Sequence, residues 1–180
     1  SFFDKKINLG LDLQGGSYLL LEIDNEPVIE QKLQNLTTTI RNYFKEKNIK
    51  INNIKIENQN IFFDVADTDK QSVIDVFQDE NSDLNPYYPR FKSHQLKIED
   101  TGLNLKVNFS RQGLITLKTS SQDQAIEIVR RRVDEVGTNE PNILKRGNNR
   151  ILVELPGLDD PMRIKALLGK TANLTFRFVT

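Results

Sequence analysis

The order of its apolar segments is the feature that most constrains how this chain folds. Residues 17–23 are apolar enough to form a buried strand, and Asp24-Asn25-Glu26-Pro27 then marks the start of a helix. Five large apolar residues follow at spacings of four and three, as in one stripe of a helix ending near Lys47. They are Ile29, Leu33, Leu36, Ile40 and Tyr43.

The next segments predict a hairpin, a short helix and a further strand. Residues 49–57 and 61–65 flank Asn58-Gln59-Asn60, residues that tolerate the positive φ of a tight turn. Thr68 and Gln71 have the spacing of a capping box at the start of a short helix. A strand over 95–98 then completes the order β-α-β-β-α-β.

The same order is predicted again after residue 101. A hairpin of residues 103–109 and 114–119 is expected around Ser110-Arg111-Gln112-Gly113, and its second strand opens the new unit. Ser121 and Gln124 have capping-box spacing before a helix that stops at Gly137. The remaining predicted elements are strands over 143–146 and 151–155, a helix over 161–168 and a strand over 174–179.

The expected fold class is therefore α+β, with two successive ferredoxin-like β-α-β-β-α-β units and antiparallel sheets. The first unit would span residues 1–101 and the second 102–180, with the joint near Asp100 to Gly102. The repeat is one of topology, because the residues of the two halves do not match.

Composition excludes several functional classes. Lys and Arg number 25 and so do Asp and Glu, so no overall field attracts a nucleic acid or an anionic membrane. The longest apolar runs, such as 18–21, fall far short of the ~20 residues that cross a bilayer. The first residue is Ser1, which suits a chain that begins within a longer protein. Cysteine is absent, which excludes disulfides and thiol catalysis.

No catalytic, metal-binding or cofactor-binding constellation is predicted. His94 is the only histidine and no G-x-S-x-G elbow accompanies it. Asp64, Asp67 and Asp69 lack the glycine and terminal Glu of a calcium loop, and the Gly15-Gly16 pair has no nucleotide-binding context. We therefore expect no enzyme activity, no metal and no cofactor.

The run Arg130-Arg131-Arg132 is the best candidate for contact with a polyanion. Successive helical positions diverge in direction, so a solvated or ion-paired face is favoured over one basic patch. Exposed strand edges that accept an extended polypeptide are an alternative mode of binding.

Four segments resemble the SecD family. Residues 10–16 read G-L-D-L-Q-G-G, and residues 126–137 read I-E-I-V-R-R-R-V-D-E-V-G before an E-P pair. Residues 150–157 read R-I-L-V-E-L-P-G, and residues 168–178 are similar to the family's L-G-x-T-A-x-L-x-F-R-x-V. The residues that carry the resemblance are Asp12, Gln14, Gly15, Gly16, Arg130, Arg132, Gly137, Glu140, Pro141, Pro156 and Gly157.

The resemblance implies the N-terminal part of the first periplasmic domain, with the head region absent. It implies a subunit of the bacterial inner membrane that assists export driven by the proton-motive force. The implied partners are SecF, the SecYEG channel and unfolded preprotein, with no nucleic acid. A helix that starts only at Ser121 is shorter than the family predicts. The alternative is a stand-alone ferredoxin-like module that binds RNA or a regulatory small molecule.

The signature residues have two interpretations. Gly15 and Gly16 allow backbone conformations denied to other residues, which suits a structural turn before a strand. The sharper hypothesis is that this turn couples the domain to a membrane helix before it. Gly137, Pro156 and Gly157 are typical of caps and turns.

Overall fold

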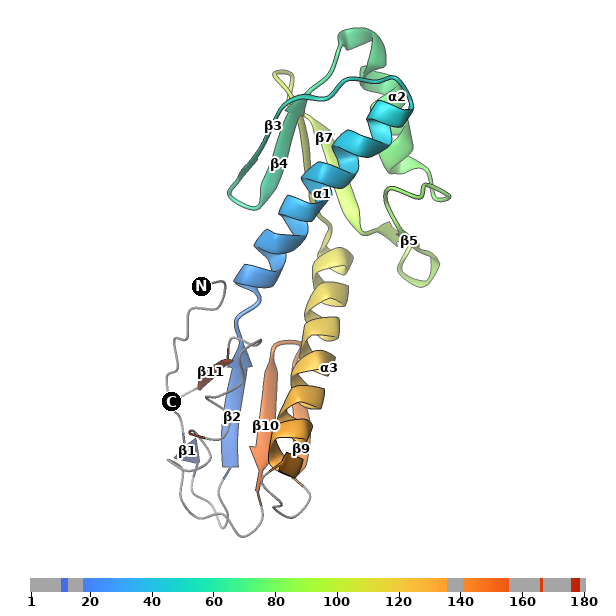
Figure 1. Cartoon of the computed structure of the whole chain (residues 1–180). Helices are drawn as coiled ribbons and strands as arrows, with labels where there is room; N and C mark the ends of the chain where they lie inside the picture. Colours follow the sequence, from blue (N-terminus) through green and yellow to red (C-terminus); the bar gives the residue numbers. More distant parts are fainter. Residues whose placement is uncertain (1–10, 13–17, 136–140, 156–165, 167–175, 179–180) are drawn as a thin grey trace. The chain divides into compact units, whose positions relative to one another are not determined.

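The computed structural model describes residues 11–12, 18–135, 141–155, 166 and 176–178. Helices and antiparallel sheets are both present, which confirms the α+β class. The chain divides into two compact units (Figure 1). Unit 1 consists of Ser1–Pro27 and Leu117–Thr180, and unit 2 consists of Val28–Thr116. Unit 2 is therefore inserted into the sequence of unit 1.

Unit 1 contains one antiparallel sheet of β1 (Leu11–Asp12), β2 (Tyr18–Ile23), β9 (Asn142–Arg146), β10 (Arg150–Glu154) and β11 (Phe176–Phe178). The strand order is β1-β2-β10-β9, and β11 also pairs with β2. Most of α3 (Arg111–Glu135) belongs to this unit. The strands predicted over 143–146 and 151–155 are confirmed as the hairpin of β9 and β10, with Gly147 at a positive φ of 58° in its turn.

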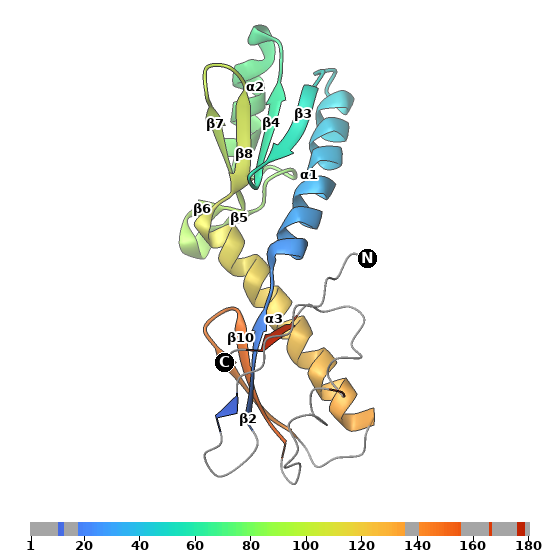
Figure 2. The same ribbon diagram turned by 90° about the vertical axis from the view of Figure 1, so that its left-hand side faces the viewer.

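Unit 2 contains a four-stranded sheet in the order β3-β4-β8-β7, seen face-on in Figure 2. Its strands are β3 (Asn52–Glu57), β4 (Asn60–Asp64), β7 (Leu96–Asp100) and β8 (Leu105–Phe109). Its helices are α1 (Glu26–Glu46), α2 (Asp67–Gln78) and a 3-10 turn (Pro89–Phe91). A small ribbon of β5 (Tyr87–Tyr88) and β6 (Ser93–His94) lies outside the main sheet.

Local sequence signals explain the first half of unit 2. The Asp24 carboxylate accepts a hydrogen bond from the Glu26 N–H (3.1 Å) at the predicted start of α1. Asn58 and Gln59 have φ values of 50° and 62°, so the predicted β3–β4 hairpin is confirmed with two left-handed turn residues. The buried residues of α1 are Ile29, Leu33, Ile40 and Phe44, close to the expected stripe.

The division into units 1–101 and 102–180 is wrong. Residue 101 lies in the turn between β7 and β8, where the Thr101 N–H donates to the Asn104 carbonyl (3.0 Å), and β8 pairs with both β4 and β7. The N-terminal strand β2 pairs with the C-terminal β10. The units are nested and not successive, because an apolar strand pattern specifies a buried face but not which sheet the strand joins.

The predicted strand over 114–119 and the capping box at Ser121 are also wrong. Both segments belong to α3, which begins ten residues earlier than predicted, at Arg111 instead of Ser121. The helix is therefore longer than predicted, and the expected departure from the family does not exist. Ser110 is the cap: its Oγ accepts from the Gly113 N–H (2.9 Å), and its carbonyl accepts from the Leu114 N–H (3.0 Å).

Two smaller predictions meet different outcomes. The capping box at Thr68 is wrong, since α2 begins at Asp67 after Ala66, whose side chain makes no capping bond. The helix predicted over 161–168 falls outside the described residues, apart from position 166. The ferredoxin-like form of the units therefore stays a prediction.

Gly113 allows the start of α3 to approach the start of β7. A Cβ atom at this position would clash with the Gln95 carbonyl oxygen, which also accepts a hydrogen bond from the Ser110 N–H (2.9 Å). The contact is with backbone, so a side chain cannot rotate away to relieve it.

We expect Gly113→Ala to lower the free energy of unfolding by about 2 kcal/mol, the range typical of overpacking. Chemical denaturation of the 180-residue chain measures this loss. Thr119→Ala, at an exposed position of the same helix, should change stability by less than about 0.5 kcal/mol. Equal stability of the two variants would contradict the proposed close approach.

Asn85 joins α2 to β7 inside unit 2. Its side chain is fully buried, and its Nδ2 donates to the carbonyls of Phe77 (2.7 Å) and Leu96 (3.0 Å). Its Oδ1 accepts from the Leu96 N–H (2.9 Å). One amide therefore satisfies three buried backbone groups that would otherwise lose their hydrogen bonds with water.

Asn85→Ala should cost about 3 kcal/mol of unfolding free energy, since each lost hydrogen bond costs about 1 kcal/mol. Urea denaturation followed by far-UV circular dichroism provides the measurement. The matched change Asn35→Ala removes an exposed amide contact on α1 and should cost little. A loss below about 1 kcal/mol for Asn85→Ala would show that the three bonds are dispensable.

Candidate functional site

The sheet of unit 1 is the candidate site, because it brings together segments that resemble one family but lie far apart in the sequence. β2 lies at its centre. On one side β2 pairs with β10 in five residue pairs, from Arg150 opposite Glu22 to Glu154 opposite Tyr18. On the other side it pairs with β1 and β11, which meet different ends of the strand. Strands from the N-terminal and C-terminal parts of the chain therefore form a single sheet.

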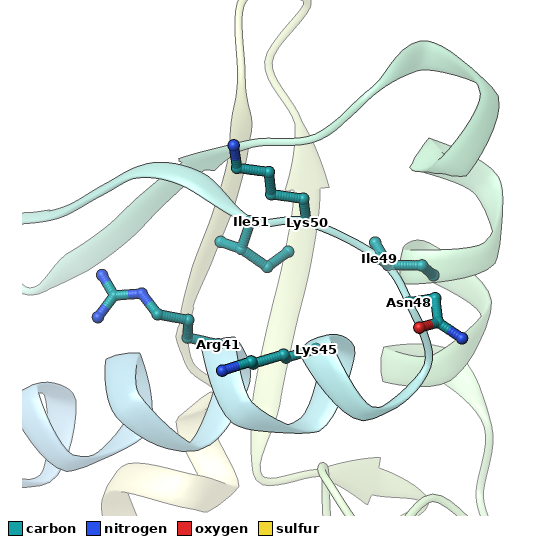
Figure 3. Close-up of a pocket in the computed structure, with 6 residues that line it drawn as sticks. All are labelled: Arg41, Lys45, Asn48, Ile49, Lys50 and Ile51. Carbon is teal, nitrogen blue, oxygen red and sulfur yellow. The ribbon is translucent and has the colours of Figure 1, made fainter.

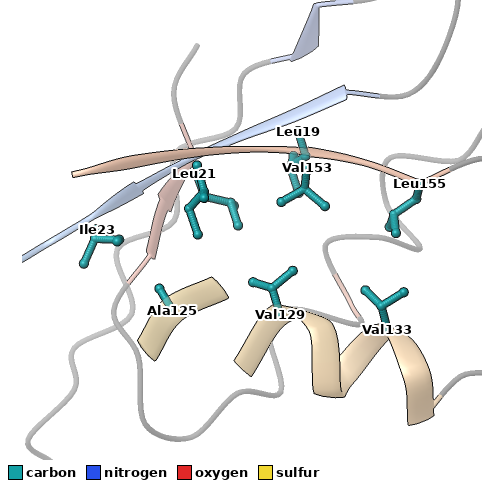
Figure 4. Packing of buried hydrophobic residues seen from close by; sticks show 9 residues of the cluster. Leu19, Leu21, Ile23, Ala125, Val129, Val133, Val153 and Leu155 are labelled. Carbon is teal, nitrogen blue, oxygen red and sulfur yellow. The ribbon is translucent and has the colours of Figure 1, made fainter. Parts of the chain in front are cut away.

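The helix α3 covers one face of this sheet (Figure 4). Ala125, Val129 and Val133 recur at a spacing of four and are fully buried. They contact alternate residues of β2 and residues of β10 or just beyond it. The sheet side of this cluster consists of Leu19, Leu21, Ile23, Ile151, Val153 and Leu155.

A buried amide on α3 holds the β9–β10 turn. Gln122 is 2% exposed, and its Nε2 donates to the carbonyls of Gly147 (3.1 Å) and Arg150 (2.8 Å). One residue further along, the Asp123 carboxylate forms an ion pair with Lys145 (2.6 Å). The Ile23 N–H of β2 donates to the Asn149 carbonyl of the same turn (2.7 Å). The turn is thus tied to the helix and to the central strand.

The opposite face of the sheet carries an apolar row. Leu20, Leu152 and Leu144 occupy directly opposed positions on β2, β10 and β9. Leu20 and Leu152 are half-buried, and Leu144 is 46% exposed. Next to this row, Arg150 is paired in register with Glu22 on one side and Arg146 on the other. This face therefore combines an aliphatic stripe with a charged border.

The structure places only some of the predicted signature residues. Asp12 ends β1 and is paired in register with Tyr18. Arg130 is exposed on α3, whereas Arg132 is half-buried and forms an ion pair with Glu135 (3.6 Å). Pro141 directly precedes β9. The other seven lie outside the described residues: Gln14, Gly15, Gly16, Gly137, Glu140, Pro156 and Gly157.

The three consecutive arginines differ in exposure and pairing. Arg130 and Arg131 are exposed, while Arg132 lies closer to the buried face and pairs with a carboxylate. Among the described residues, no group of three His, Asp or Glu side chains is placed to hold a metal ion. Within the same residues, no helix is both long enough and apolar enough to span a bilayer.

Two ionisable groups in unit 2 have shifted pKa values. A hydrogen bond from the Gly102 N–H, together with Lys70 at 3.4 Å, lowers the pKa of Asp100 against an opposing desolvation effect. Desolvation, with a further contribution from Glu80, raises the pKa of Tyr87. Asp100 lies at the β7–β8 turn and Tyr87 in the small ribbon, so neither shift marks the sheet of unit 1.

Sequence reasoning missed Gln122 as a structural residue. Glutamine within a predicted helix is usually exposed, and nothing in its local sequence shows that two carbonyls of a distant turn will face it. The burial of Gln122 can be inferred only once the helix is known to begin before Ser121. With α3 beginning at Arg111, positions 122, 125, 129 and 133 lie along one face.

Two family models match this chain, one at each end. Residues 1–26 match the family model described as the SecD/SecF GG motif. Residues 122–180 match the model described as protein translocase subunit SecDF, P1 domain, N-terminal. These two segments are nearly the same residues as unit 1, which consists of Ser1–Pro27 and Leu117–Thr180.

Curated relatives match almost the whole chain, including unit 2. Protein translocase subunit SecD of Rickettsia bellii is 35% identical over 173 residues, which is 96% of this chain and 32% of the relative. The subunit of the same name from Acetobacter pasteurianus is 35% identical over 97% of this chain and 33% of the relative. That of Desulfurispirillum indicum is 33% identical over 98% and 32%. The chain thus spans about a third of the length of these relatives.

Engineered cysteines test the strand register in a chain that has no native cysteine. Opposed residues of antiparallel strands have Cα atoms about 4.5–5.5 Å apart, within the span of a disulfide. We expect Leu20→Cys with Leu152→Cys to crosslink under mild oxidation, as measured by a gel shift that reverses on reduction.

The matched control pairs Leu20→Cys with Leu144→Cys. These positions are two strands apart, about 10 Å, which is too far for a disulfide. Failure of the first pair to crosslink would contradict the register of β2 on β10, and crosslinking of the control pair alone would place β2 beside β9 instead of β10.

Proposed function

Because the chain belongs to the SecD family of protein translocase subunits, we propose that it assists the export of preproteins through the Sec channel. In this proposal the chain is part of a subunit of the bacterial inner membrane and lies on its periplasmic side. The proton-motive force drives the export step. The chain itself contributes a scaffold and contact surfaces, with no catalytic chemistry.

The observation that carries this proposal is the pairing of β2 with β10. It joins the segment that matches the GG motif to the segment that matches the P1 domain, within one sheet and one core. A displacement applied at the GG segment would pass into this sheet, because β2 is its central strand and a packed core resists local deformation. Unit 1 is thus suited to transmit force or motion.

The partners follow from the family. We propose that the complete subunit assembles with SecF, works beside the SecYEG channel and handles unfolded preprotein. The names of the matched family models, which refer to SecD, SecF and SecDF together, support the assembly with SecF. The exposed part of the aliphatic row, at Leu144 of β9, the last strand in the order formed by the described residues, provides apolar surface for one such contact.

The GG segment is proposed to couple movement at the membrane to the sheet of unit 1. Gly15 and Gly16 lie in the sequence between β1 and β2, which are paired with each other. A β-branched side chain restricts the backbone conformations open to this connection, so Gly15→Val alters how β2 is held.

We expect Gly15→Val in the complete subunit to slow preprotein export severalfold while the subunit accumulates to its normal level. Pulse-chase labelling of an exported protein measures the rate, and immunoblotting measures the level. The same substitution in the 180-residue chain should leave the thermal unfolding midpoint nearly unchanged. Normal export at a normal protein level would refute coupling, and a strongly lowered midpoint would indicate a purely structural role.

A further inference from the structure

A pocket in unit 2 lies where α1 ends and the chain turns toward β3 (Figure 3). It has a volume of about 490 Å³, within the range of ~300–1,000 Å³ seen for ligand-binding pockets. Its lining combines aliphatic and cationic side chains with one amide. The lining residues are Arg41, Lys45, Asn48, Ile49, Lys50 and Ile51.

Backbone hydrogen bonds at the end of α1 shape this pocket. The Asn48 N–H donates to the Lys45 carbonyl (3.0 Å), and the Ile49 N–H donates to the Phe44 carbonyl (2.8 Å). Asn48 has a left-handed φ of 58°, which reverses the chain as in a helix C-cap. Ile51, which is 8% exposed, anchors the returning segment to the core of unit 2.

The three cations of the pocket differ from three other lysines of unit 2, which are paired with acidic side chains. Lys55, Lys70 and Lys106 each form an ion pair with an acidic side chain. In the part of the chain that the structure describes, no ion pair is found for Arg41, Lys45 or Lys50. Three positive charges without compensating carboxylates, placed around an aliphatic surface, favour an anionic ligand that also has an apolar part.

The arrangement of the charged ends indicates more than one anionic group. Arg41 and Lys45 are one helical turn apart and extend from the same side of α1, whereas Lys50 extends from the segment that returns toward β3 (Figure 3). Ile51 lies between Lys50 and the two helical cations. The charges are therefore distributed around the rim and do not converge on one point, as binding of a single phosphate group would require.

We propose that this pocket binds an acidic polypeptide segment in which carboxylates flank an aliphatic side chain. The aliphatic side chain would contact Ile49 and Ile51, and the carboxylates would pair with Arg41, Lys45 and Lys50. The adjoining strand β3 is at the end of its sheet, so its outer edge offers main-chain hydrogen bonds to an extended segment. This site goes beyond the proposed role in export and does not depend on it.

The test uses the 180-residue chain and a short dye-labelled peptide with a leucine between pairs of glutamates. Fluorescence anisotropy should show saturable binding that weakens with added salt, because salt screens exposed charges over about 8 Å at physiological ionic strength. Replacing the glutamates by glutamine, or the leucine by serine, should weaken binding at least about fivefold. Vesicles of phosphatidylglycerol provide an arm that tests an anionic lipid as the ligand.

The variant Lys45→Gln with Lys50→Gln should raise the Kd for the peptide about fivefold or more, since each exposed charge pair contributes up to about 1 kcal/mol. The control Lys32→Gln with Lys97→Gln removes the same charge from exposed positions outside the pocket and should leave the Kd unchanged. The absence of peptide binding, equal losses in the two variants, or binding of vesicles in preference to the peptide would overturn the proposal.

Discussion

The pairing of β2 with β10 is the contact on which unit 1 depends. β2 provides half of the surface that faces α3, and without β10 beside it Ala125, Val129 and Val133 would face an incomplete sheet. β1 and β11 have no other strand partner among the described residues, so both depend on β2 being in place. The buried amide of Gln122 and the Ile23 N–H then secure the β9–β10 turn, which keeps β10 in register.

Sequence analysis predicts those parts of the fold that local chemistry determines. The β3–β4 hairpin follows from Asn58 and Gln59, which accept left-handed conformations. The start of α1 follows from Asp24-Asn25-Glu26-Pro27, where the Asp24 carboxylate accepts a hydrogen bond from the Glu26 N–H. The start of α3 is different. Residues 114–119 have the composition of a strand, because they are rich in leucine, isoleucine and threonine. Only the hydroxyl of Ser110 and the close approach of Gly113 to Gln95 show that a helix begins there.

The family signature lies in segments that contribute strands to the sheet of unit 1, but it does not reveal the contacts between them. Residues 10–16 and 150–157 are recognisable as strings, yet neither string reveals that β2 and β10 are neighbours, because strand pairing across the inserted unit leaves no local trace. Contacts such as Gln122 with Gly147 join residues that no periodicity relates. The same limit explains the misplaced boundary at residue 101: the pattern of β8 suits either sheet, and only its partners β4 and β7 decide between them.

The nesting of unit 2 within unit 1 also sets the order in which the chain can fold. Unit 2 is contiguous in sequence and has its own sheet and core, so its contacts can form as soon as residue 116 is available. The sheet of unit 1 must wait for β10, whose partner β2 was synthesised long before. Prior folding of unit 2 shortens the effective loop between those strands, which lowers the entropic cost of closing it. Folding of the inserted unit therefore favours the later pairing of β2 with β10.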